Sequence, residues 1–126
     1  MSNPTVAVIG ASADRAKYGN KSLRAHQQQG YDVYAVNPKG GQIEGLDVYT
    51  KLRDVPVDHL NRISMYVPPQ VGLGMLDEIA AKGCDELWLN PGSESPELVE
   101  RAVDLGLNPI LACSIVSLGR HPDELD

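Results

Sequence analysis

The chain has 126 residues, of which 42% are apolar and 22% are charged, and it carries a net charge of −6 at neutral pH. This length and composition are typical of one globular domain, so we expect a single domain over residues 1–126 with its own hydrophobic core. The negative charge argues against nucleic acid as a partner, because nonspecific binding of nucleic acid needs a basic surface.

No apolar run approaches the roughly 20 residues that a membrane-spanning helix needs, so we expect no membrane partner. The N-terminus has neither the basic start nor the apolar stretch of a secretory signal. The two cysteines, Cys84 and Cys113, have no spacing typical of zinc or redox motifs. We therefore expect a cytoplasmic protein with reduced thiols and no metal site.

The first predicted strand, Thr5–Ile9, is short, apolar and rich in β-branched residues, as a strand buried on both faces should be. A loop bounded by Gly10 and Gly19 follows, and then a helix over about Asn20–Gln29 that ends at Gly30. In α/β proteins, a strand, a tight turn and a helix in this order present backbone N–H groups to a phosphate. The stretch therefore predicts a phosphate-binding loop.

Strands and helices alternate along the rest of the chain. Apolar runs predict further strands at Tyr31–Val36, Ile63–Val67, Glu86–Leu89 and Pro109–Ala112, with Val48–Tyr49 as a short edge strand or an extended segment. Helices are expected after Pro68-Pro69 and at Ser95-Pro96, where a cap residue precedes a proline. In these two helices we expect the buried faces to be Val71, Met75, Leu76, Ile79 and Ala80, and Leu98, Val99, Ala102 and Val103.

This alternation, with its short connections, predicts the fold class α/β: a single Rossmann-like doubly wound, mostly parallel sheet with helices on both faces. The polar tail from 114 to 126 is expected to be loose or partly helical. Four predicted strands end in residues that let a ligand approach the backbone or that stiffen a loop, namely Gly10-Ala11-Ser12, Asn37-Pro38-Lys39, Val67-Pro68-Pro69 and Asn90-Pro91-Gly92. Because ligands bind at the carboxyl edge of such sheets, these strand ends predict a binding cleft.

The sequence argues against a typical NAD site. That site has Gly-x-Gly-x-x-Gly after the first strand and an acidic residue at the end of the second. Here Ala11-Ser12 follow Gly10, the next glycine is Gly19, and Asn37 stands where the acid is expected. No Gly-Lys-Ser/Thr follows the first strand either, which excludes a Walker-type loop. An NAD(P)- or other dinucleotide-dependent oxidoreductase is kept as an alternative hypothesis.

No arrangement of side chains predicts catalysis. His26 lies among glutamines on a helix that we interpret as exposed there, and neither His59 nor His121 has the partners of a triad or a metal site. Cys113 ends a predicted strand and has no histidine near it in sequence, so we interpret it as a small apolar residue. We expect no catalytic residue, and hence no enzyme.

Several short motifs follow one another along nearly the whole chain, from Thr5 to Cys113. They are Gly10-Ala11-Ser12, Tyr18-Gly19-Asn20, Val36-Asn37-Pro38-Lys39, Val67-Pro68-Pro69, Trp88-Leu89-Asn90-Pro91-Gly92 and the late Cys113. In this order the chain resembles the small stand-alone CoA-binding domain proteins, which are similar to the N-terminal nucleotide-binding domain of the succinyl-CoA synthetase α subunit. It departs from the family pattern before Cys113, where Ala112 and its neighbours replace an acidic residue.

The resemblance implies coenzyme A, or an acyl-CoA, as the ligand. It implies that Gly10, Ala11 and Ser12 face the pyrophosphate or ribose, and that Lys17 and Lys39 contact phosphates. Val67, Pro68 and Pro69 would form an apolar wall for the adenine or ribose. The other implied contacts are Tyr18, Gly19, Asn37, Pro38, Asn90, Pro91 and Gly92.

The resulting hypothesis is non-catalytic binding of CoA or an acyl-CoA by a regulatory or carrier module. A nucleotide-binding subunit of a multi-chain acyl-CoA synthetase is a further alternative. The sequence leaves open a protein partner or a homo-oligomer.

Overall fold

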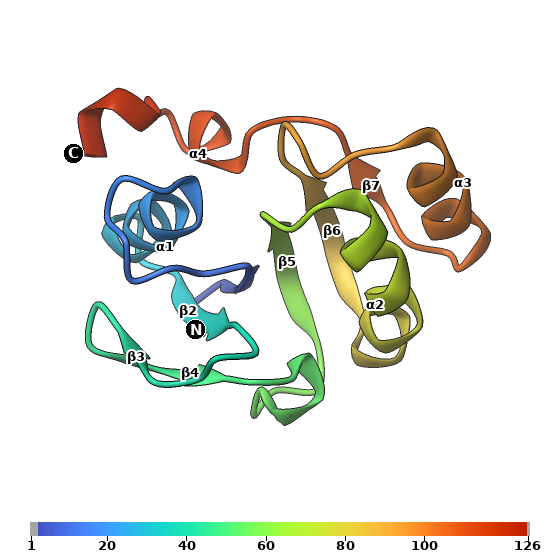
Figure 1. Cartoon of the computed structure of the whole chain (residues 1–126), viewed down its shortest axis with the longest axis horizontal. Coiled ribbons are helices and arrows are strands. Elements are labelled where there is room, and N and C mark those ends of the chain that lie inside the picture. The colour runs from blue at the N-terminus through green and yellow to red at the C-terminus, as the bar shows by residue number, and fades with distance from the viewer. Residues whose placement is uncertain (1–2, 126) are drawn as a thin grey trace.

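The computed structural model describes residues 3–125, and within them seven strands form one sheet in the order β3-β4-β2-β1-β5-β6-β7 (Figure 1). The antiparallel pair is β3 with β4, and every other neighbouring pair is parallel. This confirms the predicted Rossmann-like, mostly parallel α/β fold. The strands are β1 (Thr5–Ile9), β2 (Asp32–Val36), β3 (Gln42–Ile43), β4 (Leu46–Tyr49), β5 (Leu60–Met65), β6 (Cys84–Leu89) and β7 (Pro109–Ile110).

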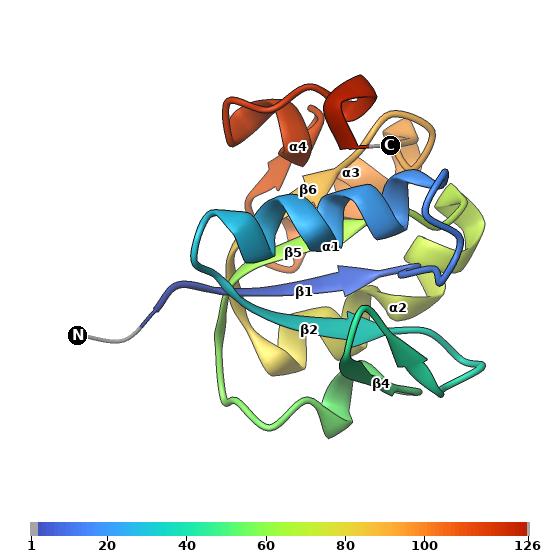
Figure 2. The same ribbon diagram turned by 90° about the vertical axis from the view of Figure 1, so that its left-hand side faces the viewer.

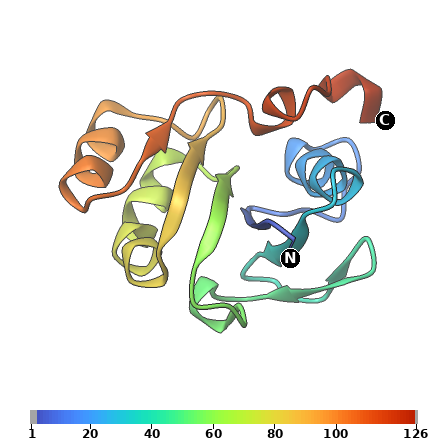
Figure 3. The ribbon, with the colours of Figure 1, turned by 180° about the vertical axis from the view of Figure 1, so that it is seen from behind.

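Helices cover both faces of the sheet, as predicted. In Figure 2, α1 lies across one face with the C-terminal segment beside it, while α2 and α3 lie on the opposite side, as the view from behind in Figure 3 also shows. No helix within residues 3–125 is long and apolar enough to cross a membrane. The helices are α1 (Tyr18–Gln28), α2 (Pro69–Lys82), α3 (Pro96–Asp104) and α4 (Ser114–Ser117), with 3-10 turns η1 (Leu52–Asp54) and η2 (Pro122–Leu125).

The central strand β1 divides the core into two layers, because its successive side chains point to opposite faces of the sheet. Val6 and Val8 pack with Leu23 of α1 on one face. Ala7 and Ile9 belong to the larger cluster on the other face, to which α2 and α3 contribute Leu76, Ile79, Leu98 and Ala102. All five residues of β1 are apolar or β-branched because both of its faces are covered.

The chain reverses its direction across the sheet between β1 and β5. From β1 the chain passes to β2 on one side, and after β4 it returns to β5 on the other side of β1. Because β1, β2, β5 and β6 are parallel, their carboxyl ends lie at one edge of the sheet. This edge, at the topological switch point, is where ligands of doubly wound sheets bind.

Three expectations about side-chain burial are wrong. His26 is fully buried rather than exposed, because α4 and η2 cover the outer side of α1 through a small cluster of Ala25, Ile115 and Leu125. Val71 is 50% exposed and Val103 is 57% exposed, although both were predicted to be buried. Helices α2 and α3 turn narrower faces to the sheet than their apolar periodicity indicates, with Gly72, Leu76 and Ile79 buried in α2 and Leu98 and Ala102 in α3.

Candidate functional site

Two glycines bring the end of β1 and the start of α1 into direct contact. Gly10 has a φ of +87°, and a Cβ on it would lie 2.8 Å from the Tyr66 carbonyl oxygen. A Cβ on Gly19 would lie 2.3 Å from the Gly10 carbonyl oxygen, a distance that no side chain can occupy. Gly19 thus allows the same close packing of helix against strand that the third glycine allows in dinucleotide-binding sheets. The predicted strand–loop–helix unit is present without the Gly-x-Gly-x-x-Gly sequence.

Side-chain amides hold the loop between these glycines in shape. The Asn37 amide, at the end of β2, donates to the Ala11 carbonyl over 2.7 Å, and the Asn20 amide donates to the Ser12 carbonyl over 2.9 Å. Arg24 is buried and donates to the Asn20 side-chain oxygen over 2.6 Å and to the Arg15 carbonyl over 3.0 Å. These hydrogen bonds hold the backbone of the loop in shape, while the Lys17 side chain at its end is exposed to solvent.

A hollow of about 330 Å³, which we call the strand-end cavity, lies at this edge of the sheet. Its size is at the lower end of the range of about 300–1,000 Å³ for small-molecule sites. Eight residues predicted from the sequence meet on its walls. The lining residues are Gly10, Lys17, Tyr18, Gly19, Tyr66, Val67, Pro68, Pro91, Gly92 and Ser93.

The other predicted site residues lie around the strand-end cavity without lining it. Ala11 and Asn90 are fully buried. The Asn90 amide donates to the Ser64 hydroxyl and to the Met65 carbonyl, so it links the ends of β5 and β6. Ser12, Asn37, Pro38 and Lys39 continue the edge past β1 and β2, and Pro69 begins α2.

Sequence reasoning missed two residues of the cavity wall, Tyr66 and Ser93. The Tyr66 hydroxyl contacts the Ser114 hydroxyl over 3.2 Å, and Ser114 in turn contacts the Ser64 hydroxyl over 2.7 Å. Burial raises the pKa of Tyr66, so its phenol stays protonated at neutral pH. Its position in the sequence could have indicated Tyr66, because it directly precedes Val67-Pro68 at the end of β5.

The chemistry of this edge suits an anionic ligand with an apolar part. The N-terminal end of α1 lies on the wall of the strand-end cavity, where a helix N-terminus favours an anion, and its N-cap residue Lys17 is an exposed cation on the same wall. Val67, Pro68 and Pro91 give the opposite wall an apolar surface. Within residues 3–125 no group of three or more His, Cys, Asp or Glu side chains is arranged to hold a metal ion.

These features define the class of protein: a doubly wound α/β domain with a phosphate-loop arrangement at its switch point. The sequence model of the CoA binding domain family matches residues 4–119 of this chain. The chain belongs to this CoA-binding domain family.

Similar proteins of known sequence or structure support this assignment. The alpha subunit of ADP-forming acetate–CoA ligase I from Pyrococcus furiosus is 36% identical over 88 residues, which are 64% of this chain and 19% of that subunit. The chain therefore spans about a fifth of the length of this curated relative.

Two solved structures extend the comparison. A conserved hypothetical protein of Pyrococcus furiosus is 34% identical with a TM-score of 0.80, and the match covers 92% of this chain and 99% of that one. The dinucleotide-forming acetyl-coenzyme A synthetase 1 of Ca. Korarchaeum cryptofilum, in complex with phosphate and ADP, is 31% identical with a TM-score of 0.73. That match covers 87% of this chain and 26% of the synthetase.

Proposed function

We propose that this protein binds coenzyme A, or an acyl-CoA, at the carboxyl edge of its sheet, as a single domain that performs no catalysis of its own. In this proposal the 3′-phospho-ADP part of the ligand lies along the loop from Gly10 to Gly19 and the end of β2. Lys17 and Lys39 contact its phosphates, and Val67 and Pro68 pack against the adenine or ribose. The role is that of a regulatory or carrier module.

The observation that carries the proposal is the convergence of eight motif residues on the strand-end cavity at the start of α1. These residues come from three strand ends and the start of α1, which are far apart in the sequence, and the fold gathers them around one hollow. The family assignment supports the same ligand.

The proposal reconciles a polyanionic ligand with a protein whose net charge is −6. Backbone N–H groups at the start of α1 and a lysine beside them create a local positive potential that the global charge does not cancel. Asn37 occupies the end of β2, where an NAD site would place a carboxylate, and its amide is engaged with the Ala11 carbonyl. A phosphate-bearing group therefore meets no carboxylate at position 37.

Calorimetric titration of the protein with CoA tests the proposal. We expect saturable one-site binding that the Lys17→Gln substitution weakens by about tenfold or more, since a hydrogen bond to a charged group contributes about 1.5–3 kcal/mol. Arg53→Gln is the matched control, because Arg53 is also an exposed cation but lies in η1 beyond the strand-end cavity. Absence of heat and of a thermal shift at millimolar CoA would refute the proposal.

A second candidate role follows from the similarity to the alpha subunit of a ligase. In this role the domain presents its bound CoA to a separate catalytic chain. Both roles require CoA binding, so they differ only in the partner. Co-purification of a second chain with the tagged protein, strengthened by added CoA, favours this role; a protein that stays alone with and without CoA favours the isolated module.

A further inference from the structure

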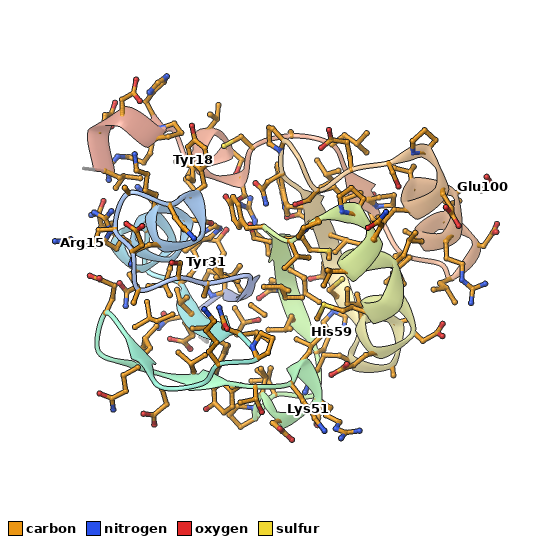
Figure 4. All side chains as sticks on the ribbon, viewed as in Figure 1. Arg15, Tyr18, Tyr31, Lys51, His59 and Glu100 are labelled. Carbon is orange, nitrogen blue, oxygen red and sulfur yellow. The ribbon has the colours of Figure 1, made fainter. Side chains whose placement is uncertain are left out.

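A second hollow of about 320 Å³, which we call the tail cavity, adjoins the strand-end cavity. Tyr18, Tyr66 and Pro91 line both hollows, so the two share a wall. Figure 4 labels Tyr18 at the start of α1, on the side that faces the C-terminal segment. The remaining lining of the tail cavity consists of Cys113, Val116, His121, Pro122 and Asp123.

The outer wall of the tail cavity is held firmly on α1. Ile115 and Leu125 of the C-terminal segment are buried in one cluster with Ala25 of α1, at 0% and 2% exposure. The Lys21 ammonium donates to the Pro122 carbonyl over 3.1 Å, and the buried Arg24 guanidinium donates to the Leu125 carbonyl. The cavity is thus a built feature of the fold.

The lining of the tail cavity selects a neutral occupant. Val116 and Tyr18 are among the most exposed large apolar side chains of the described residues, at 56% and 57%, and both are on this wall. Asp123 is the carboxylate of the lining, and the His121 ring lies 3.5 Å from it. A phosphate beside Asp123 would be repelled, whereas an uncharged apolar group covers the valine and the tyrosine ring.

Coenzyme A has a matching polarity, because its phosphates are at the nucleotide end and its pantetheine arm, with the thiol or acyl group, is uncharged. With the phosphates on the cationic side of the strand-end cavity, at Lys17, the arm leaves past Tyr18, Tyr66 and Pro91. We propose that the tail cavity binds the acyl group of a neutral, short-chain acyl-CoA thioester. This inference rests on the proposed function, and it names the ligand form that the site prefers.

Tyr66 has a defined part in this arrangement. Its hydroxyl is held by Ser114 at the shared wall, where the thioester end of the ligand passes. The phenol stays protonated because burial raises its pKa. If the Ser114 hydroxyl donates in this contact, the Tyr66 O–H is left to donate to a carbonyl oxygen of the arm or of the thioester.

Titration of the wild-type protein with CoA, acetyl-CoA, butyryl-CoA and succinyl-CoA tests the inference. Each additional buried CH₂ strengthens binding by about fourfold, so affinity rises from CoA through acetyl-CoA to butyryl-CoA. Succinyl-CoA, whose free carboxylate would approach the exposed Asp123, binds more weakly than butyryl-CoA by up to about fivefold. The substitution Asp123→Asn reduces that difference.

The substitution Val116→Trp fills the tail cavity. It weakens the binding of butyryl-CoA by a larger factor than the binding of adenosine 3′,5′-bisphosphate, which represents the phosphate end of the ligand alone. Val103→Trp is the matched control, because Val103 is 57% exposed on α3 and does not line the tail cavity. It leaves both affinities unchanged.

Alkylation of the wild-type protein gives a second readout that needs no variant. Butyryl-CoA slows the modification of Cys113 severalfold, while adenosine 3′,5′-bisphosphate at saturation does not. Cys84, at the start of β6, is the internal reference, and burial raises the pKa of its thiol to about 11. Its modification rate does not respond to either compound.

The outcomes separate the two levels of the hypothesis. If all four compounds bind with equal affinity and none protects Cys113, the acyl site is overturned and CoA binding is left intact. Absence of binding by every compound, including the bisphosphate, would overturn both. A rise in affinity with acyl length that Val116→Trp removes and Val103→Trp retains supports the inference.

Discussion

At the scale of single residues, the candidate site depends on the absence of two side chains. Gly10 and Gly19 allow the first helix to begin against the end of the first strand, so that its first residues line the strand-end cavity. The conformation of the loop between them is set by hydrogen bonds from Asn20 and Asn37. A methyl group at position 19 therefore alters the site without removing any polar contact.

Gly19→Ala should destabilise the fold by about 1–3 kcal/mol, because the new Cβ forces the helix away from the Gly10 carbonyl. The same displacement should weaken CoA binding. Gly74→Ala is the control within a helix: a Cβ there meets nothing within 4 Å, and the substitution should stabilise α2 by up to about 1 kcal/mol. Urea denaturation and calorimetry of both variants measure the two effects, and a fully stable, CoA-binding Gly19→Ala protein would contradict this account.

His26 is a second residue whose environment determines a measurable property. Its ring is fully buried, its Nδ1–H donates to the Ser22 carbonyl over 2.8 Å, and Tyr31 packs edge-on against it at 4.9 Å. Burial lowers the pKa of His26 to about 4, and the nearby Arg62 charge adds to this effect. Within residues 3–125 its Nε2 has no hydrogen-bond partner, so a proton added there would be buried without compensation.

The stability of the protein should therefore fall as the pH falls from about 6.5 to about 4. In this window the unfolded chain binds a proton at His26 and the folded chain does not, so the folded state loses up to about 3 kcal/mol. Above pH 6.5 both states are neutral at this position and the loss is absent. His26→Gln should flatten the profile in urea denaturation across this window, whereas His121→Gln, at an exposed position, should leave it steep.

At the scale of elements, the sequence predicted the strands and helices that have a strong apolar period. It could not predict that the outer side of α1 is buried as well, because the segment that covers it is the polar tail, whose α4 and η2 have few apolar residues. The serine cap of α3 was predicted and is confirmed, with the Ser95 hydroxyl accepting from the Leu98 N–H. The edge strand β3 was not predicted, because its two residues are too few to show an apolar period. It is a strand through its pairing with the adjacent β4.

The short helix α4 should contribute to stability through one residue of its single turn. Ile115 is fully buried against Ala25 and Leu125, while its neighbour Val116 is 56% exposed. Ile115→Ala should cost about 2–5 kcal/mol, the range for deleting a buried aliphatic side chain, and Val116→Ala should stay within about 0.5 kcal/mol of wild type. Thermal and urea denaturation of the pair decide this; equal stabilities would mean that the tail is not part of the cooperative fold.

At the scale of the whole molecule, the two edges of the sheet differ in what they can bind. The strand-end cavity gathers residues that follow β1, β5 and β6, and glycine and proline mark these strand ends in the sequence, although Tyr66 and Ser93 carry no such mark. The tail cavity could not be located in this way, since its far wall comes from residues 113–123, where no repeating strand signal exists. The rule for doubly wound sheets places ligands at the ends of parallel strands. It does not predict that the C-terminal segment, which follows the last strand, also lines a cavity at this edge.

The opposite edge offers a competing hollow of about 570 Å³ between η1 and α2. Its lining contains the carboxylates Asp58, Asp77 and Glu78. The Lys82 ammonium is already engaged with the Val55 and Val57 carbonyls, over 2.7 and 2.9 Å. A polyanionic ligand is therefore expected at the carboxyl edge although the larger hollow lies elsewhere.

Hydrogen exchange should distinguish the two edges directly. Saturating CoA should slow the exchange of backbone amides in residues 10–20, 66–68 and 90–93, which surround the strand-end cavity. Residues 53–58 and 77–82, around the hollow at the opposite edge, should exchange as in the free protein. NAD at the same concentration should leave all of these segments unprotected, because Asn37 replaces the carboxylate that would hold its ribose. Protection confined to 53–58 and 77–82 would move the ligand to the opposite edge, and equal protection by NAD would make the protein a general dinucleotide binder.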